Sequence, residues 1–111
     1  MFLFRLMLIA FLAVIAVYTV IVGMNHGWNL VPVFFDNVAA MSWSGQFNLD
    51  FMIFLILSAS WVIWRNGINA AGLGLGAAAL FGGMLFLSIY LLVLSVQPNA
   101  SLRSIMLGRH N

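Results

Sequence analysis

The sequence predicts an all-α membrane protein with three transmembrane helices and a short interfacial amphipathic helix in the first loop. Of its 111 residues, 65% are hydrophobic and only 5% are charged, whereas a typical soluble domain carries about 25% charged residues. So few charges could not cover a soluble surface, and a disordered chain would need low hydrophobicity and many charges. Three long apolar segments set the helix count, because the bilayer core of about 30 Å needs about 20 helical residues. The length suits one membrane domain.

The first predicted helix covers about residues 2–23. The apolar run that follows Arg5 is longer than the core of a usual signal peptide, and no small-x-small cleavage site follows it. We therefore expect a retained transmembrane helix.

We predict a short interfacial helix in the first loop, over about residues 30–41. Asn29 is a suitable N-cap, and Pro32 falls in the first turn, where its missing N–H costs little. Apolar side chains then recur at helical spacing, while about 12 residues are too few to span a bilayer. These apolar residues are Val31, Phe34, Phe35, Val38 and Met41.

The second and third helices are predicted over about residues 49–64 and 70–96. Residues 42–45 read as a turn, Asn48 as the N-cap, and Asp50 as a first-turn carboxylate that complements the helix dipole. The connection between the two helices is short, so they must form an antiparallel hairpin. The tail, residues 97–111, predicts a short surface helix at Leu102, Ile105 and Met106.

Small residues form one stripe along the third predicted helix, at Gly72, Gly76, Ala79 and Gly83. Such stripes let helix backbones approach closely in lipid, where no hydrophobic drive brings helices together. The stripe predicts packing against other transmembrane helices, either of further copies of this chain or of a larger membrane complex.

Tryptophans and one arginine are the predicted interfacial anchors, because tryptophan favours the headgroup level. Trp28 and Trp43 bracket the interfacial helix, and Trp61, Trp64 and Arg65 end the second helix.

The charges give a topology. With three straight helices, Arg5 and Arg65 share one side of the membrane, and Arg103 and Arg109 share the other side with the loop that holds both aspartates. The positive-inside rule then has two arginines on each side. Arg5 beside the amino terminus favours a cytoplasmic N-terminus, which places the tail outside.

The chain has few titratable residues that could form a catalytic or ligand-binding site. His26, Asp36 and Asp50 are candidate polar contacts in or beside the first loop, and Asp50 could also pair with Arg103 or Arg109. We expect no enzyme, cofactor or metal site, since the chain has no cysteine, no glutamate and no nucleophile or metal-ligand motif. No basic run points to nucleic acid, and no ionisable residue lies mid-helix, where ion-coupled carriers need one.

Several stretches resemble a family of small bacterial three-helix integral membrane proteins of unknown function. They are His26–Trp28, the amphipathic segment 31–41, residues 45–51, and the later segments 80–86 and 90–92. The chain lacks the proline before and the arginine after the third-helix tyrosine, here Tyr90, that related sequences often have. The resemblance implies an inner-membrane location and the three-helix plan, and it implies no activity.

The function expected from these observations is that of a non-enzymatic accessory subunit, packed in a homo-oligomer or a larger membrane complex. Two alternatives stay open. One is a small oligomeric pore or transporter lined by the glycine face, and the other is a lipid-binding protein that uses the amphipathic loop.

Overall fold

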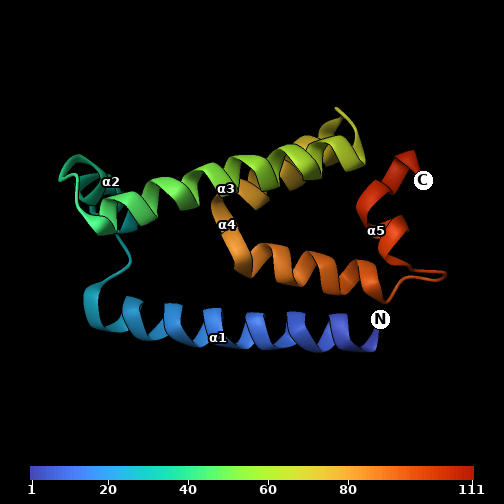
Figure 1. The fold of residues 1–111 in the computed structure, drawn as a ribbon, viewed down its shortest axis with the longest axis horizontal. Helices are drawn as coiled ribbons and strands as arrows, with labels where there is room; N and C mark the ends of the chain where they lie inside the picture. Colours follow the sequence, from blue (N-terminus) through green and yellow to red (C-terminus); the bar gives the residue numbers. More distant parts are fainter.

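The computed structural model describes residues 1–111 and is entirely helical. The elements in chain order are α1 (Phe2–His26), α2 (Leu30–Ala39), α3 (Trp43–Asn66), α4 (Ala70–Ser95), α5 (Leu102–Leu107) and a 3-10 turn (Gly108–His110). Figure 1 shows the second half of α4 lying between α1 and α3, and α2 lying beside the start of α3. The predicted fold class is confirmed, because α1, α3 and α4 are each long and apolar enough to cross a membrane and α2 is a short helix in the first loop.

α1 has 25 residues and is therefore about 37 Å long at 1.5 Å per residue. It extends to His26, beyond the predicted end, and stops where Gly27 takes a φ of 85°. This positive φ is a conformation that glycine adopts without steric cost and that a right-handed helix cannot continue. α2 then begins at Leu30, as predicted.

α3 begins earlier than predicted, at Trp43. The Ser42 hydroxyl oxygen accepts a 3.2 Å hydrogen bond from the Gly45 backbone amide and caps the helix, so residues 43–45 are helical and do not form a turn. The predicted cap, Asn48, instead donates its side-chain amide to the Phe34 carbonyl oxygen at 3.2 Å, which ties α3 to α2. Asp50 consequently lies beyond the first turn, and its predicted role at the helix dipole is wrong.

α4 bends sharply at Gly83, where φ is 56° and ψ is −139°. A straight helix of 26 residues would be about 39 Å long, with its two ends on opposite sides of the molecule. Instead, the Tyr90 hydroxyl accepts a 2.7 Å hydrogen bond from the Asn66 side chain, four residues before α4 begins. The Ser95 carbonyl accepts a 2.6 Å hydrogen bond from Arg5 at the start of α1. α4 therefore runs inward, turns back, and ends at the end of the molecule where it began (Figure 1). It has the length and composition of a membrane-spanning helix, but it does not run from one side of the molecule to the other.

The bend lies beside the middle of the other two long helices. A Cβ at Gly83 would lie 3.0 Å from the Phe51 ring and 3.6 Å from Leu55 in α3. The next residue, Met84, shares a surface hollow with Phe11 and Val14, which lie near the centre of α1. The bend is thus placed at about the depth where the bilayer would have its midplane.

The fold-back overturns the predicted topology of the tail. The tail lies against the C-terminal end of α3, where the Arg65 side chain donates to the Ile105 carbonyl oxygen at 2.6 Å. Arg103 and Arg109 therefore share one end of the molecule with Arg5 and Arg65, and not with the first loop. Equal numbers of arginines on the two sides would require a straight α4.

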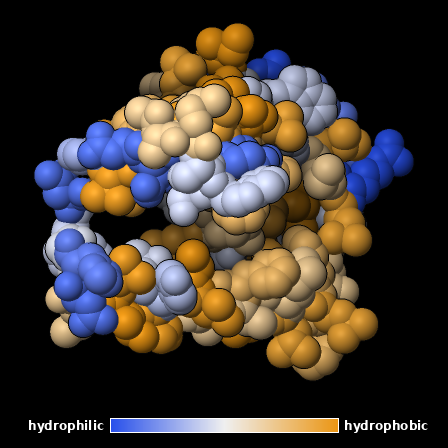
Figure 2. All heavy atoms as spheres, turned by 60° about the vertical axis from the view of Figure 1, so that its left-hand side comes forward, coloured by the Kyte–Doolittle hydropathy of each residue, from blue (hydrophilic) through white to orange (hydrophobic).

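Most of the apolar surface faces outward. Only 13 of 111 residues are buried, and the most apolar windows of α1, α3 and α4 are 11%, 11% and 17% buried. Figure 2 shows hydrophobic residues over most of the face seen there. Such a surface suits lipid or other transmembrane helices and not water.

Candidate functional site

All four arginines lie at one end of the molecule, which we call the arginine end: Arg5 near the start of α1, Arg65 at the end of α3, Arg103 in α5 and Arg109 in the 3-10 turn. The chain's two acidic side chains, Asp36 and Asp50, lie in α2 and in the first half of α3, towards the other end. The hydrogen bonds of Arg5 and Arg65 all go to neutral oxygens. Charge is therefore separated along the molecule, with the positive groups at the end that carries both chain termini.

Arg65 joins three parts of the arginine end. Its Nε donates to the Ile105 carbonyl oxygen at 2.6 Å, and its Nη1 donates to the Tyr90 hydroxyl at 3.2 Å. The guanidinium also lies 5.8 Å from the centre of the Tyr90 ring, within cation–π range. One side chain thus connects α3, the returning half of α4 and the tail, although the sequence predicted only an interfacial anchor.

Trp61 and Trp64, also predicted as anchors, hold the tail. The Trp61 indole N–H donates to the Met106 carbonyl oxygen at 3.0 Å. The Trp64 ring stacks on His110, with centroids 4.0 Å apart and planes inclined by 16°, and His110 Nε2 lies 2.9 Å from the Trp64 carbonyl oxygen. These contacts join residues more than forty positions apart in the chain, so local spacing could not reveal them. Trp28 and Trp43 lie at the opposite end, where both are exposed.

The predicted packing stripe is used within the chain. Gly72, Gly76 and Ala79 are buried in the first half of α4. A Cβ at Gly76 would lie 2.7 Å from Ile63 Cδ1, so this glycine permits close approach of α4 to α3. Gly83 serves differently, as the bend itself. Three of the four residues of the stripe are therefore buried within the chain, and only Gly83 borders a surface hollow.

The remaining polar candidates do not form a site. His26, Asp36 and Asp50 are all exposed, and the chain has no cluster of three or more His, Cys, Asp or Glu side chains that could hold a metal ion. The predicted pairing of Asp50 with Arg103 or Arg109 is wrong, because the fold-back carries the tail to the other end of α3. His26, Asp36 and Asp50 are therefore not members of any such cluster.

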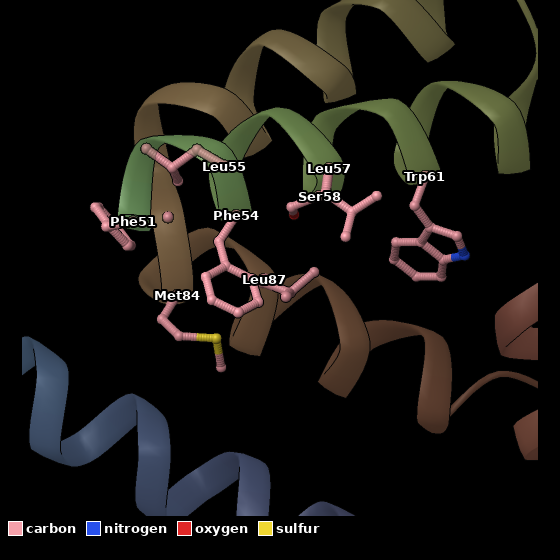
Figure 3. Close-up of a pocket in the computed structure, with 9 residues that line it drawn as sticks. Phe51, Phe54, Leu55, Leu57, Ser58, Trp61, Met84 and Leu87 are labelled. Carbon is pink, nitrogen blue, oxygen red and sulfur yellow. The ribbon is translucent and has the colours of Figure 1, made fainter. Parts of the chain in front are cut away.

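An apolar groove of about 460 Å³ lies between α3 and the returning half of α4. Figure 3 shows Phe54 of α3 facing Met84 and Leu87 of α4 across it, with Phe51 and Trp61 towards its two ends. Seven of its nine lining residues are hydrophobic, and the other two are Ser58 and Gly83. The broken backbone of α4 is thus open to this groove.

A polar recess of about 450 Å³ lies at the arginine end, between the end of α3, the turn after α4 and the tail. Arg65 and Arg109 both line it, and only three of its twelve lining residues are hydrophobic. The two hollows differ in kind: the groove is apolar and lies at bilayer depth, and the recess is polar and lies where the apolar helices end.

Comparison with known proteins finds no family model, no curated protein and no solved structure that matches this chain. The resemblance to small bacterial three-helix membrane proteins stays a prediction. The groove and the recess are the structural features from which we argue a function.

Proposed function

We propose that this chain is a non-enzymatic accessory subunit of the bacterial inner membrane, which packs against the transmembrane helices of a further copy or of a larger complex. The observation that carries the proposal is the break in α4 beside the apolar groove. Gly83 lines the apolar groove, and its backbone is not helical.

A helix that is interrupted at membrane depth is costly where its backbone faces lipid, because an unpaired polar group in hydrocarbon costs several kcal/mol. Irregular backbone at membrane depth is therefore tolerated where it is buried in protein or lines a water-filled cavity. The groove is apolar, which disfavours water and favours a partner helix as the covering group.

The proposed orientation places both chain termini in the cytoplasm. With α4 folded back, four arginines lie at one end and none at the other. Arginine-rich ends of membrane proteins face the cytoplasm. The sequence favoured a cytoplasmic N-terminus from Arg5 beside the amino terminus. The fold-back adds Arg103 and Arg109 to the side that already held Arg5 and Arg65, and it moves the tail to that side. The bacterial origin rests on the family resemblance.

The test is to fill the groove and follow the assembly. Ser58→Trp places an indole inside the groove, whereas Ile56→Trp places the same group at an exposed position of α3 that does not line it. Both variants and the wild type are tagged, expressed at native level, extracted in mild detergent and resolved on native gels.

We expect the wild type to migrate as an assembly, Ser58→Trp to lose it, and Ile56→Trp to keep it. Mass spectrometry of the assembly distinguishes copies of this chain from a different subunit. A wild type that migrates as a single chain with no co-purifying protein contradicts the proposal, as does an assembly that survives Ser58→Trp.

A further inference from the structure

The polar recess at the arginine end is a candidate ligand site that is separate from the groove. Its walls come from three segments: Arg65 and Asn66 at the end of α3, Gln97 and Asn99 in the turn after α4, and Arg109 in the tail. These segments meet only because α4 folds back. The recess opens at the level where the apolar part of each long helix ends.

Two positive charges line the recess without an acidic side chain to balance them. Arg65 is held in place by neutral partners, chiefly the Ile105 carbonyl at 2.6 Å and the Tyr90 hydroxyl at 3.2 Å. Its two other contacts, from Nη1 to Asn66 Oδ1 at 3.4 Å and from Nη2 to the Ser104 carbonyl at 3.5 Å, are long. One of the five guanidinium N–H groups, on Nη2, has no partner within the chain and is available to a ligand.

Arg109 is the more available of the two cations. It is exposed, and its guanidinium lies close against Gly67, which follows α3. A side chain at Gly67 would occupy the place of Arg109 Nη1. Gly67 thus leaves room for the Arg109 guanidinium beside the end of α3, in a second hollow that Arg109 lines in addition to the recess that it shares with Arg65.

The chemistry that fits two guanidinium groups is a phosphate. Its oxygens accept several hydrogen bonds at once, and the planar fork of arginine matches them in pairs. Tryptophan favours the headgroup level of a bilayer, and Trp61 and Trp64 lie within one turn of Arg65 on the same helix. A phosphate at this depth is available in the headgroups of the surrounding lipids.

We propose that the recess binds the phosphate of an anionic phospholipid headgroup, with Arg65 and Arg109 as its ligands. A lipid with a net negative charge is favoured over a zwitterionic one, because its headgroup brings no additional positive charge beside the two arginines. Each basic side chain near an anionic membrane surface contributes about 1 kcal/mol, which is roughly a fivefold change in affinity.

The chain offers a matched control for this site. Arg109→Gln and Arg103→Gln remove the same charge from the same tail, and both residues are exposed. Arg109 lines the recess and Arg103 does not. Purified wild type and variants are titrated, by native mass spectrometry, with phosphatidylglycerol, with phosphatidylcholine and with inorganic phosphate.

We expect the wild type to retain phosphatidylglycerol in preference to phosphatidylcholine. Arg109→Gln should weaken that retention roughly fivefold or more, and Arg103→Gln by less than about twofold. Circular dichroism serves to verify that both variants keep the wild-type helix content.

Three results would overturn the proposal. Equal loss in the two variants indicates general surface attraction and no site at the recess. Equal retention of the two lipids removes the requirement for an anionic headgroup. Binding of inorganic phosphate without retention of phosphatidylglycerol shows that the ligand is a free phosphate.

Discussion

Replacing Gly83 by alanine should destabilise the protein, because the bend in α4 requires glycine. At φ 56° and ψ −139°, an L-residue is strained, and conformations in such sparsely populated regions cost about 1–3 kcal/mol. The added Cβ would also lie 3.0 Å from the Phe51 ring, which is close enough to force a small shift. We therefore expect Gly83→Ala to lower the free energy of unfolding by about 1–3 kcal/mol.

The sign of the effect tests the fold-back directly. In a straight helix, alanine is more favourable than glycine by roughly 0.5–1 kcal/mol, so a continuous α4 predicts that Gly83→Ala stabilises the protein. Gly74→Ala is the control, since Gly74 lies in the helical first half of α4 and a Cβ there meets no atom within 4 Å. We expect this control to be as stable as the wild type or more so.

The assay is reversible unfolding in mixed micelles, with increasing fractions of a denaturing detergent and helix content followed by circular dichroism. Wild type, Gly83→Ala and Gly74→Ala are compared under the same conditions. If Gly83→Ala is as stable as Gly74→Ala, α4 runs straight and the reasoning from the bend is refuted, together with the shared position of the four arginines.

Three further predictions follow from the same geometry. The chain has no cysteine, so cysteines introduced singly at Asn29, Ile68 and Asn111 can be labelled with a membrane-impermeant maleimide. We expect the maleimide to label Ile68→Cys and Asn111→Cys from one side of the membrane and Asn29→Cys from the other side. Labelling of Asn111→Cys from the same side as Asn29→Cys would indicate a straight α4. Gly76→Ala should cost about 1–3 kcal/mol of unfolding free energy through overpacking against Ile63, and an unchanged unfolding midpoint would contradict that close approach. Tyr90→Phe removes the hydroxyl that accepts the Asn66 and Arg65 hydrogen bonds and should lower the free energy of unfolding by about 1–3 kcal/mol. A decrease no greater than that caused by a conservative change at an exposed position would show that these hydrogen bonds do not stabilise the fold.

The sequence predicted the fold class because that class depends on composition and on the lengths of apolar runs. Three helices long enough to span a bilayer and a loop helix over about residues 30–41 required no knowledge of tertiary contacts. The start of α3 was mispredicted because Ser42 and Asn48 are both good N-caps. The contact with α2 distinguishes the two residues: Asn48 donates its side-chain amide to the Phe34 carbonyl oxygen, and Ser42 caps the helix.

The bend in α4 was missed although its signal was in the sequence. Adjacent glycines at 82 and 83 are among the usual causes of a helix kink. Gly83 also fitted the small-residue stripe at helical spacing, and the stripe gave it a sufficient role in packing. Whether Gly83 bends the helix or packs within a straight one depends on which path of the residues after 83 has the lower free energy: a return to the arginine end or a straight continuation of α4. That difference involves hydrogen-bond partners such as Arg5, which lies far away in the chain.

Hydrogen bonds at the arginine end hold the bend. Any backbone group that the bend leaves unpaired would cost several kcal/mol in hydrocarbon. Hydrogen bonds to a charged group contribute about 1.5–3 kcal/mol each, and three of them exist only when α4 returns: Arg5 with Ser95, Arg65 with Tyr90, and Arg65 with Ile105. These gains are of the same order as the cost of one or two unpaired groups. A partner helix in the groove would cover the break without disturbing those three bonds, so assembly should raise the stability of the bent form, and the bent form is in turn the one that presents the groove.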